Sequence, residues 1–292
     1  WSDVGNAVSM HNCLSEREAV AWPVSAVEWH APSGTLWVTA LQFSLYSTDI
    51  DARRGALCMF DADPQRQRVE RWDVRFDTPD ATGLWVHAWN DGVVVYGGPM
   101  MVTAGPGRNE SGPTTSNLFV FVPRNNMPSR FVAKPVHAPP HAGGAAAAEP
   151  LCHMVTTVVG LSNSRLVAAC AHSHNNTDHV SLYSSNQRLI SPWRLAATLD
   201  DAVYVKAHDL DATLSERWLS LYRFNSSSIV VAPLFVELDD DDHVRVNASD
   251  SFAYIRVPGI LTWVSMLAQT GQTDTVAFVK QVDDDDDGGG GG

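Results

Sequence analysis

Short apolar segments that alternate with polar residues recur along most of the chain. At residues 72–76, Trp, Val and Phe occupy every second position, and Asp and Arg stand between them, so an extended strand there has one apolar face. Gly, Pro, Asn, Asp and Ser separate these segments, and few stretches repeat apolar residues at helical spacing. The pattern predicts an all-β protein made of short strands.

The predicted strands group into five consecutive units, of which the first four hold four strands each and the fifth holds three. They are residues 24–30, 35–40, 56–60 and 69–76 in the first unit; 84–89, 93–96, 118–122 and 130–136 in the second; 153–160, 165–170, 179–183 and 188–199 in the third; 203–208, 218–223, 229–236 and 243–247 in the fourth; and 252–257, 260–267 and 275–281 in the fifth.

Four-stranded units that start roughly 50–70 residues apart are typical of β-propeller blades. We therefore expect one propeller domain over residues 1–282, with residues 4–10 supplying the strand that the fifth blade lacks. Two expected loops, residues 97–116 and 139–150, account for the longer intervals and are candidate contact elements. The alternative fold is a β-sandwich with a second small β domain. Residues 283–292, five Asp and five Gly, are expected to form a flexible tail.

The first unit carries a family resemblance. The sequence VSAVEWHAPSGTLWV from residue 24 places a Pro-x-Gly turn between two strands, and ALCMFD follows at residue 56. This arrangement resembles a WD40 blade, with Phe60 where that family has the Trp of its Trp-Asp pair. The likeness is clearest over residues 24–61, and the other units resemble WD40-like and NHL-like blades in strand rhythm alone. The resemblance implies a propeller fold.

The charge balance narrows the class of partner. The formal net charge is -13, and no basic stripe is present, which argues against nucleic acid because phosphate binding needs clustered Lys and Arg. No run of apolar residues is long enough to span a bilayer.

Cysteines and Asn-x-Ser/Thr sequences favour the secretory route. Four cysteines can form two disulfides in any of three pairings, or can remain as four buried thiols. Four candidate glycosylation sites also occur. The cysteines are Cys13, Cys58, Cys152 and Cys170, and the acceptor residues are Asn109, Asn175, Asn225 and Asn247. We expect an extracellular or cell-surface location, with a cytoplasmic one as the alternative.

Candidate chemistry is sparse. One histidine stands in the first strand of each of the first four units, where the strands of a propeller line the central channel, so these are channel-lining candidates. They are His30, His87, His153 and His208. We predict no metal site and no cofactor: the alternation in His172-Ser173-His174 reads as a strand that enters a loop, and residues 239–242, all Asp, as a solvated turn.

Motifs for nucleophilic, nucleotide-dependent and zinc-dependent catalysis are missing from the sequence. A glycoside hydrolase needs only two or three carboxylates from separate blades, and Glu28 and Asp211 are of that kind. The tryptophans are expected in the core, and any exposed one would be a binding hot spot or a platform for a sugar ring.

Together these features predict a non-enzymatic extracellular or cell-surface β-propeller glycoprotein, of the adhesion or receptor type, that binds a protein or glycan partner. The first alternative is an intracellular WD40-like scaffold subunit of a larger assembly. The second is a propeller glycoside hydrolase with channel carboxylates.

Overall fold

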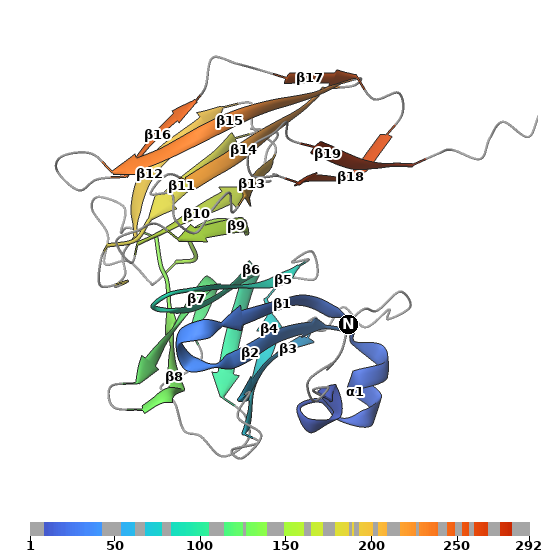
Figure 1. Cartoon of the computed structure of the whole chain (residues 1–292), viewed down its shortest axis with the longest axis vertical. Coiled ribbons are helices and arrows are strands. Elements are labelled where there is room, and N and C mark those ends of the chain that lie inside the picture. Colours follow the sequence, from blue (N-terminus) through green and yellow to red (C-terminus); the bar gives the residue numbers. More distant parts are fainter. Residues whose placement is uncertain are drawn as a thin grey trace, which may run out of the picture.

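The computed structural model of the chain consists mostly of antiparallel β-sheet (Figure 1). It describes residues 9–42, 54–61, 68–77, 83–104, 114–124, 127–138, 149–160, 165–171, 179–186, 189 and 193–200, and beyond these the backbone of the strands β13 to β19.

The elements before residue 200 are η1 (Met10–Asn12), α1 (Glu16–Ala21), β1 (Val24–His30), η2 (Ala31–Ser33), β2 (Thr35–Leu41), β3 (Arg54–Asp61), β4 (Val69–Phe76), β5 (Leu84–Trp89), β6 (Gly92–Ala104), β7 (Thr115–Arg124), β8 (Met127–Pro135), β9 (Met154–Gly160), β10 (Leu166–Ala171), β11 (His179–Ser184) and β12 (Arg194–Asp200). The later strands are β13 (Tyr204–His208), β14 (Arg217–Asn225), β15 (Ser228–Leu238), β16 (Val244–Ala248), β17 (Ala253–Arg256), β18 (Ile260–Leu267) and β19 (Thr275–Gln281).

The predicted all-β class is confirmed, and each predicted strand segment overlaps an observed strand. Two boundaries differ most from the prediction. β12 begins at Arg194 rather than at residue 188, and Leu189 before it has a φ of 55°, which a regular strand does not allow. β6 continues to Ala104, so the first part of the expected loop 97–116 is strand.

Consecutive strands pair as antiparallel meanders, but the first two predicted units are joined into one sheet. β6 pairs with β5 through its first half and with β4 through Met100–Ala104, which gives the order β1-β2-β3-β4-β6-β7-β8 with β5 beside β6. β9 to β12 form a second sheet, β13 to β17 a third, and β18 and β19 a two-stranded sheet. Among the described strands, pairing does not close into a ring.

Among the described residues before residue 200, three apolar cores lie on alternating faces of the strands. In the second unit, Val93 and Val95 of β6 face a core shared with the first unit, whereas Val94 between them faces a core shared with the second sheet. The first unit alternates in the same way: Trp37 of β2 belongs to the shared core, and Val38 faces a third core on the opposite side. The order of layers is therefore an N-terminal segment, the first unit, the second unit and the second sheet.

The first strands of neighbouring layers lie side by side. The Ser25 hydroxyl of β1 donates to the Leu84 carbonyl at the start of β5 at 2.6 Å, and His30 at the end of β1 lies against the carbonyl of Trp89 at the end of β5. β1 and β5 therefore run in the same direction. β1 and β5 contact each other, but the backbone partner of β1 is β2 and that of β5 is β6.

β9 continues this series. The Asn117 side chain at the start of β7 bonds the backbone of Cys152, just before β9, at 2.6 Å and 3.3 Å, and Gly160 at the end of β9 lies close to Trp89 at the end of β5. Since β7 and β5 both flank β6, these two contacts fix β9 parallel to β5.

The N-terminal segment does not supply the expected closing strand where it is described. Residues 4–8 lie outside the described residues, and Met10 belongs to the short helix η1. The predicted loop 139–150 and the tail 283–292 also lie outside them, apart from the last two residues of that loop. The Pro-x-Gly turn is observed: η2 holds Pro32, and Gly34 ends it with a φ of 64°, a conformation that glycine adopts without strain.

Candidate binding surface

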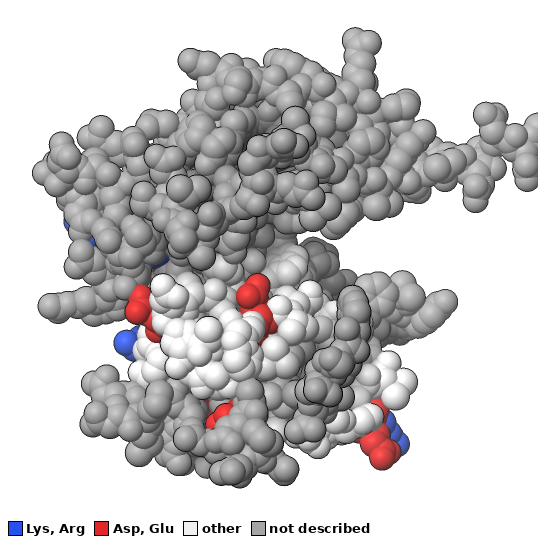
Figure 2. Space-filling model, viewed as in Figure 1, with Lys and Arg blue, Asp and Glu red and all other residues white. Residues whose placement is uncertain are grey.

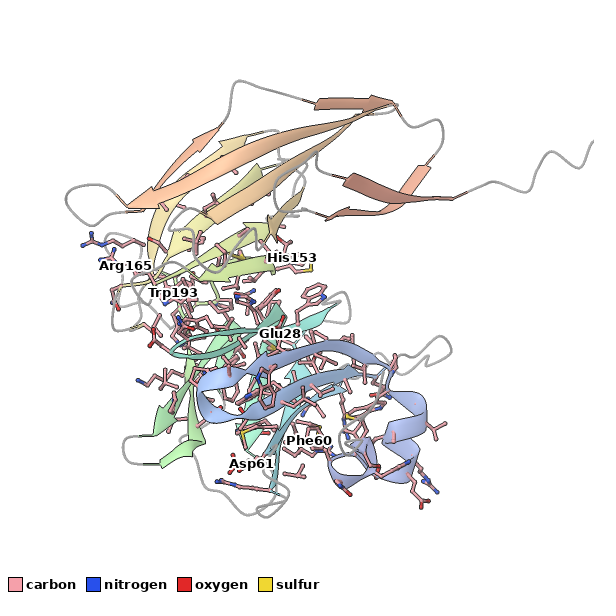
Figure 3. All side chains as sticks on the ribbon, in the orientation of Figure 1. Glu28, Phe60, Asp61, His153, Arg165 and Trp193 are labelled. Carbon is pink, nitrogen blue, oxygen red and sulfur yellow. A yellow bond between two sulfur atoms is a disulfide. The ribbon has the colours of Figure 1, made fainter. Side chains whose placement is uncertain are left out.

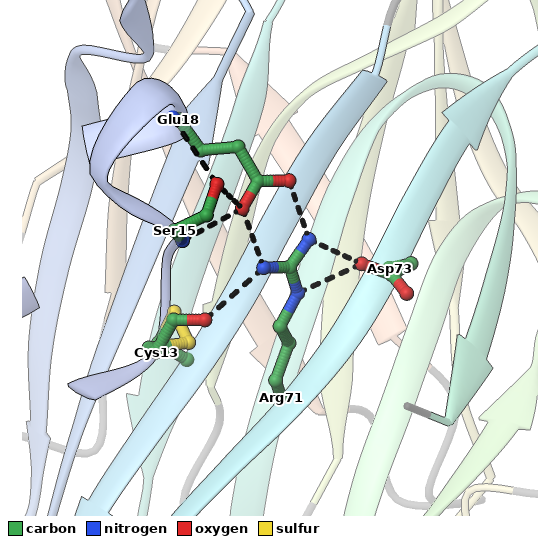
Figure 4. The surroundings of a disulfide bond; sticks show 6 residues. Cys13, Ser15, Glu18, Arg71 and Asp73 are labelled. Carbon is green, nitrogen blue, oxygen red and sulfur yellow. Dashed lines mark hydrogen bonds and ion pairs between the residues drawn. A yellow bond between two sulfur atoms is a disulfide. The ribbon is translucent and has the colours of Figure 1, made fainter. Parts of the chain in front are cut away.

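A short helix covers part of the outer face of the first unit. α1 has six residues and begins with a capping box, in which the Ser15 hydroxyl accepts from the Glu18 backbone N–H and the Glu18 carboxylate accepts from the Ser15 N–H (Figure 4). The box satisfies donors that a helix start would otherwise leave without partners. A helix this short is marginal alone, so its stability depends on what it packs against.

Arg71 of β4 holds α1 on the sheet (Figure 4). Its guanidinium donates to both carboxylate oxygens of Glu18 at 2.8 and 2.9 Å, to Asp73 at 2.8 Å and to the Cys13 carbonyl at 3.1 Å. The bidentate hydrogen bond to Arg71 lowers the pKa of Glu18 to about 2, against partial desolvation that raises it. The same bond raises the pKa of Arg71.

A disulfide fixes the same segment covalently. Cys13 is bonded to Cys58, which is fully buried on β3, and Leu14 and Trp22 pack beside this bond against β2 and β3. Cys152 and Cys170 form the second bond, between the segment before β9 and β10. The sequence allowed either two disulfides or four buried thiols, and the four cysteines form two disulfides.

Among the described residues, no element covers the same face of the sheet over β1. Val27 stands opposite Val38 and Trp29 opposite Leu36, so these β1 side chains share the face that α1 covers over β2 and β3. They are nevertheless about half exposed: Val24 is 47%, Val27 53% and Trp29 48% exposed, and Val20 at the end of α1 is 87% exposed. We name Val20, Val24, Val27 and Trp29 the α1–β1 strip.

The strip holds most of the exposed large apolar side chains of the described residues. The other is Leu195 of β12, which is 53% exposed and belongs to the second sheet. From residue 19 to residue 34 the chain has one charged residue, Glu28, apart from the buried His30. Figure 2 shows the described surface over β1 and β2 as largely uncharged, with separate acidic groups on it. A contiguous apolar patch is a common feature of interaction sites.

The structure separates the tryptophans into buried and exposed ones, which the sequence did not. Trp37, Trp72 and Trp193 are buried, as expected of core residues, and Trp22 packs under the helix. Trp29 is the exposed one among those described. It is therefore the candidate hot spot among the tryptophans with described side chains.

Of the channel-lining candidates, His30 is buried beside the core that the first two units share. Its Nδ1 is 2.6 Å from the Ser33 hydroxyl, and its ring meets Phe131 edge-on at 5.8 Å. Burial lowers the pKa of His30, and the carbonyls of Asn90 and Trp89 offset part of this, although Nε2 makes no hydrogen bond of good geometry with either. A neutral His30 is what this site favours.

The other three candidate histidines stand on or beside three different strands. His87 stands on β5 and His153 just before β9, where Figure 3 shows it in the upper layer, away from Glu28 on β1. His208 ends β13, where only the backbone is described. Within the described residues, no three His, Cys, Asp or Glu side chains gather closely enough to hold a metal ion.

The remaining predicted sites are described in part. Asn225 ends β14 and Asn247 stands on β16 opposite Phe235, whereas Asn109 and Asn175 lie outside the described residues. Asp211, the second predicted carboxylate, also lies outside them, as do residues 172–178 and 239–243. Glu28 is half-buried and alternates with Val27 and Trp29, so it lies on the opposite face from the strip. No helix in the described part of the chain is long and apolar enough to cross a membrane.

Sequence reasoning missed the helix that defines this surface. Its signal was present, since Ser15 and Glu18 have capping-box spacing. Comparison with known proteins adds no assignment: no protein-family model matches the chain, and no curated protein sequence does.

Proposed function

We propose that the chain is an extracellular or cell-surface binding protein that recognises a protein or glycan partner through the α1–β1 strip and carries out no chemistry. The observation that carries this proposal is the uncovered apolar face of β1, with Val27 and Trp29 about half exposed beside a rigidly held helix. Tryptophan is among the residues most enriched in binding hot spots.

The disulfides support the location. Cys13–Cys58 and Cys152–Cys170 are bonds of the kind that persist in oxidising compartments and are rare in the cytosol. Cys58 and Cys170 are fully buried, so reductants reach these bonds with difficulty in the folded protein. An extracellular or cell-surface site is the environment in which this arrangement is stable.

The layer order supports a propeller-type fold for this scaffold. In a propeller, four-stranded meanders pack face to face and their first strands run parallel around the axis. β1, β5 and β9 run in the same direction in neighbouring layers, and both faces of the second unit are buried against neighbours. We propose that the five units are blades of such a stack. The uncovered face of β1 favours an open end at the first blade.

The location is tested by intact mass. The protein is secreted from a eukaryotic host and its mass is measured before and after enzymatic deglycosylation, with thiol alkylation before and after reduction. We expect alkylation to add mass only after reduction, and deglycosylation to remove mass. Four thiols that react without reduction, with no mass lost on deglycosylation, would instead favour the intracellular scaffold.

The binding site is tested with labelled protein on cells. We compare the wild type with the double variant Val27→Thr/Trp29→Thr, which removes apolar surface and keeps β-branched side chains suited to a strand. Leu195→Thr is the matched control, because Leu195 is an equally exposed apolar strand residue outside the strip. We expect binding to fall about tenfold in the double variant and to stay unchanged in the control. Binding that does not depend on the strip would contradict the proposal.

A further inference from the structure

We infer that the partner segment that docks on the α1–β1 strip is an amphipathic α-helix of a protein, with an apolar face bordered by basic residues, lying beside α1 over β1. The inference rests on the proposed function and adds the class and shape of the partner.

The position of the partner helix follows from that of α1, which covers part of the same sheet face. α1 packs over β2 and β3, and the chain then turns at Trp22 and Pro23 into β1, so that, within the described part of the chain, the same sheet face is open over β1. Neighbouring strands are about 5 Å apart, so a helix over β1 would lie roughly 7–10 Å from α1, the usual spacing of packed helices. A helix there would bury Val20 of α1 together with the β1 side chains.

The length also fits a helix. From Val24 to Trp29 the strand advances about 17 Å, at roughly 3.3 Å per residue. A helix of about 11–12 residues covers this distance, so apolar residues at every third or fourth position meet all four residues of the strip.

Other occupants fit less well. A partner strand cannot add to the free side of β1, because β5 lies there and the Ser25 hydroxyl donates to its Leu84 carbonyl. A sugar needs hydrogen-bonding groups beside an aromatic ring, and the strip presents valines around Trp29, with the nearby Ser25 hydroxyl already used. A second copy needs about 800 Å² per partner, whereas the strip leaves roughly 400 Å² exposed.

The charge of the protein indicates which residues border the apolar face of the partner helix. The chain carries a formal net charge of -13, so the electrostatic field of the whole protein favours a basic partner over an acidic one. This field attracts basic residues at the borders of the apolar face of the partner helix and repels acidic ones.

The test uses a stapled peptide of about 14 residues, with leucines along one helical face and lysines elsewhere, and follows its fluorescence anisotropy at physiological salt. The controls are the same peptide with glutamate in place of lysine and a version whose helix is broken by a central proline. The protein variants are Val27→Thr/Trp29→Thr, Leu195→Thr and Val20→Ser, the last on a helix side chain too exposed for its loss to unfold the protein.

We expect saturable binding of the lysine peptide. It should weaken about tenfold in the double variant, about threefold in Val20→Ser, and not in Leu195→Thr, and both control peptides should bind about tenfold more weakly. If the lysine peptide bound all protein variants equally, its binding would be charge attraction without a defined site, which would overturn the inference. The inference would also be overturned if the lysine peptide did not bind, or if the proline-containing peptide bound as tightly as the lysine peptide. If cell binding depends on the strip but the peptide does not bind, the inference of a helical partner is wrong and the proposed function stands. A dimer in sedimentation that Val27→Thr/Trp29→Thr dissociates would assign the strip to a second copy and overturn the inference.

Discussion

Trp37→Ala tests the packing between the first two units. Trp37 of β2 is fully buried, stacks on Trp72 at 5.5 Å, and meets Phe121 of β7 and Phe131 of β8 edge-on at 5.3 and 4.9 Å. Its indole N–H donates to the Thr35 hydroxyl at 2.9 Å. The side chain therefore joins both units, and its removal leaves a cavity between them.

The expected loss of stability is large. Truncation removes roughly 200 Å² of buried apolar surface, which corresponds to at most about 5 kcal/mol at about 25 cal/mol per Å². Measured losses for buried Trp→Ala and Phe→Ala changes are about 3–5 kcal/mol, and the lost hydrogen bond adds about 1 kcal/mol. We expect the free energy of unfolding to fall by about 4–5 kcal/mol.

Equilibrium urea unfolding under oxidising conditions measures this loss, with Trp29→Ala as the matched control. Trp29 stands on the neighbouring strand and is half exposed, so its truncation leaves no sealed cavity and should cost about 1 kcal/mol. Equal losses for the two variants, or a loss below about 2 kcal/mol for Trp37→Ala, would refute the assignment of Trp37 to a core between the units.

Three further changes follow from the fixed N-terminal segment and the disulfides. Because the folded pKa of Glu18 is about 2, below its ordinary 4.5, its ion pair stabilises the fold above pH 4.5 and this contribution is lost as the pH falls toward 2. Glu18→Gln, which keeps the capping box, should lower the free energy of unfolding by about 1–2 kcal/mol at pH 6 and not at pH 2, and a constant difference would contradict this. Replacing both Cys13 and Cys58 by Ser should cost about 4 kcal/mol, and replacing Cys152 and Cys170 about 3 kcal/mol, because the first pair closes the longer loop, 45 against 18 residues. The reverse order in urea unfolding would show that loop length does not govern these losses.

The strands could be predicted from the sequence because apolar and polar residues alternate, as in β4, or because a short run of apolar residues lies between polar and turn-forming ones, as in β7. The pairing of β4 with β6 could not, since it is made by backbone groups that every residue carries. It also depends on the extension of β6 past Gly97 to Ala104, a segment that begins with Gly97, Gly98 and Pro99 and therefore reads as a loop.

The binding surface, too, could be predicted from the sequence only in part. The sequence predicted that an exposed tryptophan would mark a binding surface, but β1 and β2 both carry a tryptophan. Which one is exposed depends on the sheet faces to which they belong. Trp37 faces the second unit, whereas Trp29 faces the layer of α1, which ends short of it.

Trp29 also distinguishes an open stack of blades from a closed ring. Ring closure would pack the last blade on the outer face of β1, and Trp29 would then be as buried as Trp37, which leaves no face for a partner. Hydroxyl-radical footprinting with mass spectrometry measures the oxidation rates of Trp29 and Trp37 in one sample of the wild-type protein. We expect Trp29 to be oxidised at least about fivefold faster than Trp37, because it is 48% exposed and Trp37 is 0% exposed. Equal protection of the two would show that the chain covers its own β1 face, and the binding surface would then have to be sought elsewhere on the molecule.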